Sequence, residues 1–498
     1  MSFGPPPSIY TQSTLAADRA RRRRRFRLLG AVTAAIVAVG GLGGWLLMSG
    51  DDGPGDQKTV AVAQAADDVR ETVEKRPVSP EGQSVLEFSE EGLAARPDTD
   101  PRYAPGTWAT GSILAKGIAT RVDGYRIGDE SGDKAWTLDL GGHLCAVTDH
   151  VTADGRTAVV VQPPQPEGAK SEGVCDQVVL LDLDTGEKLW QKTMPSADAA
   201  FVTNTNITLA KGVVAVGWGH GSVAYDMKNG KQLWNGTSTS ECEDKGFAGG
   251  RELLALEACG ELPDTRYEVQ RLDPRTGEPQ WTYRLASGVQ DVYLPSSDPP
   301  VLAVAAGDSL VTDLITLDDD GKHQATISLG GYDAKCDDRY FGSSYFGTLE
   351  NCDGVVVGPT QAYVTSKEST DPDQPADWIV AFDLKTGRGQ GKFDGRAFQQ
   401  VFPLRMNGDD LLIFRQGRTG FQSAAVVSWN ARTDRETPLL LFSLPEDDDS
   451  ALGDPEQSDM VYEQGRVFFA KRELSRDDKH PKDPVLVAVG YGTAGLKH

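Results

Sequence analysis

The stretch LDLDTGEKLW, residues Leu181–Trp190, runs from an apolar segment through a glycine to a tryptophan. An aspartate shortly before a glycine can accept an Asx-type hydrogen bond, and the glycine can adopt the positive φ that reverses the chain. The stretch is therefore predicted to be a β-hairpin. Variants of it return from about residue 125 to the C-terminus, which indicates that most of the protein is built by repetition.

Four copies of the hairpin share a turn glycine that is followed four residues later by tryptophan. The pairs are Gly132 with Trp136, Gly186 with Trp190, Gly230 with Trp234, and Gly277 with Trp281. Three later copies, at Gly321, Gly387 and Asp434, keep the turn and lose the tryptophan. The copies recur roughly every 40–50 residues, a period typical of propeller blades and of some helical repeats.

The pattern of apolar residues decides between these two architectures. Segments such as Val178–Leu183 and Leu411–Phe414 are short and bounded by Gly, Asp or Pro, and no long stretch after residue 105 shows a helical apolar stripe. We therefore expect an all-β fold, a β-propeller of eight blades, with seven as the alternative. The last unit is short, so a strand within Thr107–Lys116 is expected to complete it. The tryptophans are expected to cover the crevices between blades.

Three copies carry a resemblance to a known family. The segments VVLLDLDTGEKLW, VAYDMKNGKQLW and VQRLDPRTGEPQW resemble the tryptophan-containing repeats of the PQQ-like, or quinoprotein-type, β-propellers. The resemblance covers roughly residues 106–498 and weakens in the later units. The whole layout also looks like that of the membrane-tethered propellers of high-GC Gram-positive bacteria. Some relatives of this kind assemble envelope proteins or act as sensor domains, whereas others are PQQ-dependent dehydrogenases.

The N-terminal region reads as a membrane anchor. Residues 28–48 are uncharged and apolar, and as a helix they would span about 31 Å, the thickness of a bilayer's hydrocarbon core. Seven arginines precede this stretch, so the positive-inside rule places the N-terminus in the cytoplasm. A cleaved signal peptide is the alternative. It is disfavoured because the nearest small-x-small site, Ala63–Ala65, lies well beyond the apolar run.

These features predict four segments. Residues 1–27 form a basic, disordered cytoplasmic tail, and residues 28–48 form a transmembrane helix. Residues 49–105 form an acidic extracytoplasmic linker, in which a short helix around 59–75 is permitted, and residues 106–498 form the propeller. The net charge of −23, with the arginines concentrated before the anchor, would repel phosphates and disfavours a nucleic-acid partner.

All six cysteines occur after residue 140, and their even number suits an oxidising compartment. They are Cys145, Cys175, Cys242, Cys259, Cys336 and Cys352. The count alone allows 15 connectivities. Pairing in sequence order is the simplest, because each pair then falls within one repeat. Six buried free thiols are the alternative.

The sequence offers no recognisable catalytic, cofactor-binding or metal-binding constellation. The resemblance implies that a quinoprotein enzyme would use adjacent cysteines and a calcium held by acidic and amide side chains, and this chain has no Cys-Cys pair. The acidic segments Asp182–Gly186 and Asp318–Gly321 look like fragments of calcium loops, but the hairpin turn needs the same residues. The insertion Gly330–Tyr363 contains a polar and aromatic cluster that would suit a ligand or a plain surface loop: Tyr332, Lys335, Asp337, Asp338, Arg339, Tyr340 and Tyr345.

The sequence therefore favours a non-catalytic binding or scaffold module, displayed outside the cytoplasmic membrane on a single-pass anchor. Its expected partners are the membrane and an envelope protein or glycan, with no cofactor. The alternative is a PQQ-dependent dehydrogenase or another propeller enzyme with its site at the central channel.

Overall fold

The computed structural model describes residues 64–90, 102–128, 132–164, 173–237, 242–260, 264–307, 310–336, 348–369, 377–396, 399–417, 422–445, 449–475 and 483–493. Residues 64–498 form one compact unit. The predicted cytoplasmic tail and transmembrane helix lie outside the described residues. Within the part of the chain that is described, no helix is long and apolar enough to cross a membrane.

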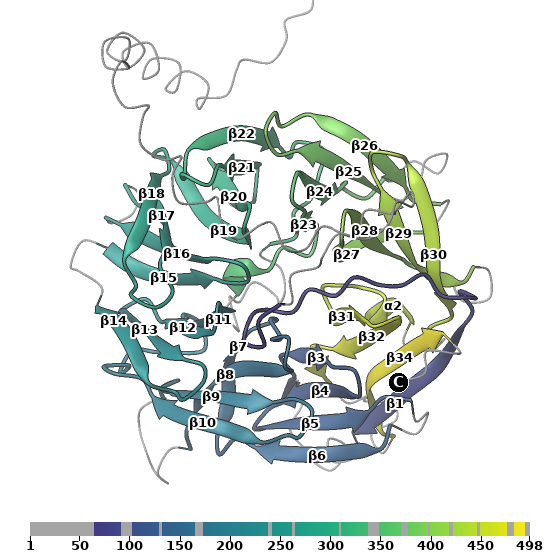
Figure 1. The fold of residues 1–498 in the computed structure, drawn as a ribbon, viewed down its shortest axis with the longest axis horizontal. Helices are drawn as coiled ribbons and strands as arrows, with labels where there is room; N and C mark the ends of the chain where they lie inside the picture. The colour runs from purple at the N-terminus through teal and green to yellow at the C-terminus, as the bar shows by residue number, and fades with distance from the viewer. Residues whose placement is uncertain are drawn as a thin grey trace, which may run out of the picture. The chain divides into compact units, whose positions relative to one another are not determined.

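The described strands form eight four-stranded antiparallel sheets arranged as the blades of a propeller (Figure 1). Blade 1 contains β3 (Thr107–Ala109), β4 (Ile113–Ile118), β5 (Arg121–Arg126) and β6 (Lys134–Asp139). Blade 2 contains β7 (His143–Val147), β8 (Arg156–Gln162), β9 (Gln177–Asp182) and β10 (Lys188–Thr193). Blade 3 contains β11 (Asn206–Ala210), β12 (Val213–Gly217), β13 (Gly221–Asp226) and β14 (Gln232–Thr237). Blade 4 contains β15 (Cys242–Ala248), β16 (Leu253–Cys259), β17 (Arg266–Leu272) and β18 (Pro279–Arg284).

The second half of the ring repeats this pattern. Blade 5 contains β19 (Val289–Ser297), β20 (Pro300–Ala306), β21 (Asp313–Leu317) and β22 (His323–Ser328). Blade 6 contains β23 (Val355–Val357), β24 (Gln361–Thr365), β25 (Trp378–Asp383) and β26 (Gly389–Asp394). Blade 7 contains β27 (Val401–Asn407), β28 (Asp410–Arg415), β29 (Ala424–Asn430) and β30 (Arg435–Phe442). The all-β, eight-bladed prediction is confirmed, apart from the one-turn helices η1 (Thr348–Glu350) and α2 (Asp449–Leu452).

Blade 8 is completed by a strand from the N-terminal side of the domain. Its sheet has the order β1-β34-β32-β31, built from β31 (Ser458–Glu463), β32 (Arg466–Lys471), β34 (Val485–Thr493) and β1 (Gly82–Glu90). A second short pairing joins β2 (Arg102–Tyr103) to β33 (Glu473–Leu474).

The position of the closing strand corrects two expectations. The segment Thr107–Lys116 does not close the ring. It supplies β3 and most of β4, which are buried throughout because they lie toward the propeller axis. The strand that does close the ring, β1, alternates buried and exposed positions from Leu86 to Ser89, as an outermost strand should. The propeller therefore begins before Gly106, and part of the predicted linker belongs to it.

The segment before the closing strand is ordered without being helical. Residues 64–81, called the strap below, form no helix at all. Val69 of the strap makes an antiparallel bridge with Thr152, between β7 and β8, and Glu81 makes a parallel bridge with Leu441 in β30. The strap therefore reaches from blade 2 to blade 7, and Figure 1 shows it crossing the ring as a purple trace.

The hydrophobic core lies between neighbouring blades. Successive side chains of a strand point to opposite faces of its sheet. On β9, Val178 and Leu180 pack in a cluster shared with blade 3, whereas Val179 and Leu181 pack in a cluster shared with blade 1. A blade strand is therefore buried on both faces, which explains the uninterrupted apolar run before Asp182.

Each repeat tryptophan lies against the turn glycine of the next blade. A Cβ added to Gly186 would lie 2.4 Å from Trp136, and one added to Gly230 would lie 2.9 Å from Trp190. The indole N–H groups of Trp190 and Trp234 donate to carbonyls of the neighbouring turns, at 2.8 Å from Met227 O and 2.9 Å from Pro274 O. These contacts explain the pairing of glycine and tryptophan, since a side chain at the turn would displace the indole.

Replacing a turn glycine by alanine tests this packing. Gly277 has φ +73° and a Cβ there would lie 2.8 Å from Trp234, whereas Gly288 has φ +93° and no atom within 4 Å. Both Gly277→Ala and Gly288→Ala should lose about 1–2 kcal/mol because an L side chain is strained at positive φ. Gly277→Ala should lose about 1–3 kcal/mol more through overpacking. Urea unfolding measures both losses, and equal losses would contradict the proposed contact.

Candidate functional site

The topology gives the ring two distinct ends. In every blade the hairpin between the first and second strands lies at one end, here called the hairpin face. The connection between the second and third strands lies at the opposite end, here called the far face. The first strands lie nearest the axis (Figure 1). Side chains from different blades therefore meet around the axis, where propeller proteins hold ligands.

Toward the far face, a buried charge network joins blades 1 and 8. The ammonium of Lys116 on β4 is fully buried and lies 3.3 Å from Asp459 Oδ2 on β31. Thr107 Oγ1 donates to the same oxygen at 2.7 Å, and Arg472 Nε donates to Asp459 Oδ1 at 2.7 Å. The Asp459 carboxylate thus pairs with two buried cations and accepts a hydrogen bond from a hydroxyl.

The charges in this network set its ionisation. Burial by itself would raise the pKa of Asp459, but the neighbouring charges of Lys116 and Arg472 hold that pKa well below its usual range. Burial lowers the pKa of Lys116, and the attraction of Asp459 offsets part of that shift. The network is therefore an internally neutralised cluster.

The long insertion between β22 and β23 joins this network. Its described ends are fastened by the disulfide Cys336–Cys352. The next residue, Asp353, lies 3.3 Å from Arg472 Nη1, and Lys335 Nζ lies 2.6 Å from Glu456 Oε1. The insertion is therefore anchored to blade 8 by ion pairs on both sides of its disulfide.

Only two of the seven residues of the ligand cluster that the sequence predicts in the insertion are among the described residues. Tyr332 packs edge-on against Phe382, with ring centroids 5.2 Å apart, and Lys335 forms the ion pair with Glu456. These two side chains are used in packing and pairing within the fold. The other five members lie outside the described residues: Asp337, Asp338, Arg339, Tyr340 and Tyr345.

A third contact carries the insertion to two further blades. Glu350 in η1 accepts a hydrogen bond from the backbone N–H of Gly249 at 2.6 Å, and its Oε1 lies 3.0 Å from Nε2 of His150. Burial would lower the pKa of His150, but the Glu350 carboxylate outweighs it and raises that pKa. The insertion thus contacts the hairpins of blades 2 and 4 by charge and hydrogen bonding.

Asp377 is a buried carboxylate at the junction of blades 6 and 7. Its side chain accepts a hydrogen bond from the backbone N–H of Val401 at 2.8 Å. Only 3% of the residue is exposed. Burial raises the pKa of Asp377 to about 7, and the hydrogen bond from Val401 only partly opposes that shift. Sequence patterning could not single out this residue, because its ionisation depends on a contact with the next blade.

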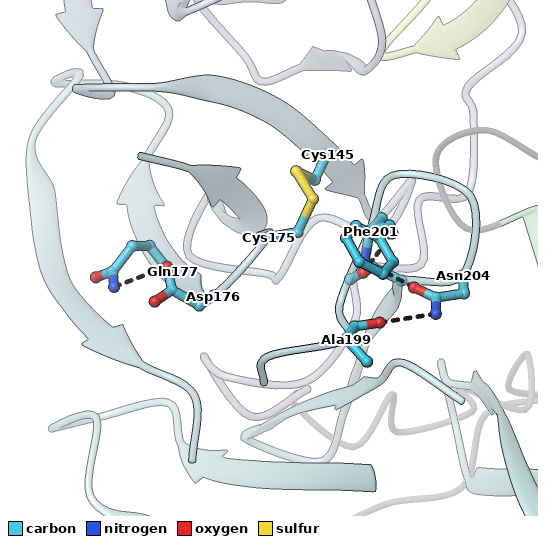
Figure 2. Close-up of a disulfide and its surroundings, with 8 residues drawn as sticks. Cys145, Cys175, Asp176, Gln177, Ala199, Phe201 and Asn204 are labelled. Carbon is cyan, nitrogen blue, oxygen red and sulfur yellow. Dashed lines mark hydrogen bonds between the residues drawn. A yellow bond between two sulfur atoms is a disulfide. The ribbon is translucent and has the colours of Figure 1, made fainter. Parts of the chain in front are cut away.

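The cysteines pair in sequence order. Cys145 on β7 is bonded to Cys175, which lies just before β9, with 6.0 Å between the Cα atoms. Figure 2 shows this disulfide beside the connection from β10 to β11, where Asn204 caps the loop by accepting from Phe201 N and donating to Ala199 O. Cys242 and Cys259 are directly opposed on β15 and β16 and form the second bond. All three disulfides act within or beside single blades.

The acidic hairpins function as turns. Asp182 Oδ1 accepts from the backbone N–H groups of Asp184 and Thr185, at 3.0 and 2.9 Å. Asp318 Oδ1 accepts from Asp320 N and Lys322 N in the same way. These oxygens are the ones that a calcium loop would need, and the turn already uses them.

The described residues contain one group with the spacing of metal ligands, Cys242, Glu257 and Cys259. Its two sulfurs are bonded to each other. A disulfide sulfur offers no thiolate to a metal ion, so the oxidised protein has no thiolate ligand at this place.

The carboxylates of Asp459 and Glu463, on the first strand of blade 8, do not fit a PQQ and calcium site. Asp459 is neutralised by Lys116 and Arg472 toward the far face. At the hairpin face, Glu463 is held by Arg70 and Arg405. Calcium requires several carboxylate or carbonyl oxygens free of competing cations.

A family described as "Outer membrane protein assembly factor BamB" matches residues 118–247, from the end of β4 into β15. This match covers part of the propeller, and it agrees with the resemblance of the repeats to PQQ-like β-propellers. No curated protein matches the chain.

Solved structures of PQQ-like propellers and related folds are similar at low identity. BamB from Moraxella catarrhalis is 13% identical, with a TM-score of 0.43, over 83% of this chain and 100% of that one. The quinohemoprotein alcohol dehydrogenase ADHIIG from Pseudomonas putida HK5 is 13% identical, with a TM-score of 0.46, over 85% of this chain and 79% of that one. A europium-containing methanol dehydrogenase is 12% identical, with a TM-score of 0.45, over 83% and 93%. Similarities this weak do not choose between a scaffold and an enzyme.

Removing the charge of Asp459 tests the axial network. Asp459→Asn leaves Lys116 and Arg472 buried without their shared anion, so the free energy of unfolding at pH 7 should fall by about 3–5 kcal/mol. The pKa of Asp459 is depressed in the folded state. Its contribution is therefore present above the unfolded pKa of about 3.9 and is lost as the pH falls.

The control for this experiment is Asp320→Asn. Asp320 pairs with Lys322 at an exposed hairpin, so its removal should leave the unfolding midpoint unchanged. Chemical denaturation of both variants at pH 7 and near pH 2 measures the difference. A similarly small loss of unfolding free energy in both variants would show that the buried network of Asp459 stabilises the fold no more than an exposed ion pair does.

The pH dependence of Asp377→Asn tests the buried carboxylate. An acid whose pKa is raised in the folded state destabilises the fold as it ionises. Stability should therefore decline between about pH 4 and pH 7. Asp377→Asn removes this titration and should be more stable than the parent protein at pH 8, by about 2–4 kcal/mol. Parallel pH profiles for the two proteins would contradict the shifted pKa.

Proposed function

We propose that this protein is a non-catalytic binding or scaffold module, held at the outer surface of the cytoplasmic membrane by an uncleaved helix at residues 28–48. The observation that carries the proposal is the state of the propeller axis. Toward the far face the Asp459 carboxylate is paired with Lys116 and Arg472, and toward the hairpin face the Glu463 carboxylate is paired with Arg70.

Two segments of the chain, the insertion and the strap, also contact residues of several blades near the axis. The insertion reaches blades 2, 4 and 8 through Glu350 and Asp353. At the hairpin face, the strap makes contacts with blades 1, 2, 7 and 8. Segments fixed in this way leave rigid loops and strand edges as the binding surface, which suits a protein or glycan partner of the envelope.

The enzyme alternative is tested directly. The full-length protein, purified in detergent and incubated with PQQ and Ca²⁺, should reduce no electron-accepting dye with simple alcohols or sugars. Its melting temperature should also be unchanged by PQQ and Ca²⁺, because the Asp459 and Glu463 carboxylates at the axis are already paired with cations. Dye reduction that depends on PQQ would overturn the non-catalytic proposal.

The anchor and the binding role are tested together in cells. The full chain should stay with the membrane fraction after a high-salt or carbonate wash, and deletion of residues 28–48 should release it. Crosslinking in intact cells followed by capture should recover an envelope protein with the full chain. Recovery of nothing above the background of an unrelated anchored domain would count against the binding role.

A further inference from the structure

The strap is seated on the hairpin face as an extended peptide ligand would be. Its inward and outward positions alternate: Arg70, Thr72 and Glu74 are partly or largely buried, whereas Glu71, Val73 and Lys75 are exposed. This period of two is that of a strand with one face bound. The segment Arg-x-Thr-x-Glu therefore presents three side chains to the ring.

Glu74 occupies a site built from two blades. Its Oε1 accepts from Gln464 N at 2.9 Å and from Arg405 Nη2 at 2.5 Å, and its Oε2 accepts from Gly465 N at 2.8 Å. Its own backbone N–H donates to Asn407 Oδ1 at 2.7 Å. The side chain is 3% exposed. Two backbone donors and a guanidinium are the groups that bind a carboxylate most strongly.

The other two inward residues are bound by polar groups. Thr72 Oγ1 donates to Glu463 Oε1 at 2.5 Å, and the Thr72 carbonyl accepts from Arg405 Nη1 at 2.7 Å. Arg70 Nη2 donates to the carbonyl of Ala109 at 2.6 Å and lies 3.5 Å from Glu463 Oε2. Each of the three inward side chains is therefore bound by residues of the hairpin face, which come from blades 1, 7 and 8.

The strap contributes little to the hydrophobic core. Val69 is partly buried against one core cluster, but Val73 and Val78 are 68% and 107% exposed, whereas the following strand β1 buries Leu86 and Phe88. Burial of apolar area is the main source of folding free energy. The strap can therefore leave the ring without opening the core, while β1 cannot.

We propose that the hairpin face is a peptide-binding groove that takes an extended segment of the pattern Arg-x-Thr-x-Glu, with the glutamate in the carboxylate site formed by Arg405, Gln464 and Gly465. In the isolated chain the strap fills this groove and competes with any partner. A partner polypeptide with such a segment binds when it displaces the strap. This inference specifies a site for the binding role proposed above.

The test uses a fluorescent peptide of residues 64–81 and the full-length protein in detergent. A variant lacking residues 64–80 retains β1 and should bind the peptide with a micromolar Kd. The parent protein should bind it at least about 100-fold more weakly, because the tethered strap acts at an effective concentration near millimolar. Absence of binding to a deletion variant that still melts cooperatively would overturn the proposal.

Matched peptides test the recognition pattern. Glu74→Gln in the peptide should weaken binding at least tenfold, because it removes the charge from the buried carboxylate site. Glu71→Gln makes the same change at an outward position whose partner, Arg251, is about half exposed, and it should change the Kd by no more than about threefold. Equal effects at the two positions would refute the assignment of Glu74.

A second protein variant keeps the proposal testable if the deletion does not fold. Glu74→Gln in the full chain weakens the strap in place about tenfold, so this variant should bind the added parental peptide about tenfold more tightly than the parent protein does. An unchanged Kd for the peptide in the folded Glu74→Gln variant would overturn the proposal. Both measurements use purified components and are independent of the capture experiment in cells. Peptide binding can therefore fail while an envelope partner is still captured, and peptide binding can succeed while no partner is captured.

Discussion

A ring of β-sheets closes when its first and last strands are joined, and here that join pairs β1 with β34. The pairing brings residues 82–90 beside residues 485–493, across nearly the whole chain. Because β1 belongs to blade 8 but comes before blade 1 in the sequence, the residues that precede it, 64–81, lie against the ring and cross its hairpin face. The strap, its carboxylate site and the early start of the domain all follow from this closure.

The closure also explains why charges gather between blades 8 and 1. These blades are remote in sequence and have no repeat tryptophan between them, since β1 stands as the outermost strand of blade 8. Phe88 of β1 stacks on Tyr125 of blade 1 with ring centroids 3.6 Å apart, and the Lys116 to Asp459 pair joins the same blades nearer the axis. A buried ion pair adds little net stability over apolar packing, but its geometry is demanding. We interpret the network as fixing how blade 8 meets blade 1.

Local signals predicted the repeating part of this protein well. The Asp182 turn, the glycine at positive φ and the tryptophan four residues later are read from contiguous residues, so the blade and the eightfold ring could be derived from them. The closing strand could not, because β1 has no hairpin of its own and its partner lies about 400 residues away. The residues that pair at the axis were missed for the same reason. Lys116, Asp459 and Arg472 are ordinary charges in three separate strands or loops until the ring brings them together.

The predicted start of the propeller at Gly106 was too late, because amino-acid composition does not distinguish a bound polar segment from a free linker. Residues 64–81 are polar, charged and rich in proline near their end, which is also the signature of a solvated linker. In the ring their polar groups are used by fixed partners, since Glu74 is held by Arg405 and two backbone N–H groups and Thr72 by Glu463. A segment bound by hydrogen bonds and ion pairs needs no apolar residues, so hydropathy cannot separate it from a free tether. The alternation of buried and exposed positions from Arg70 to Lys75 does separate them, because a free tether has no reason to bury every second side chain.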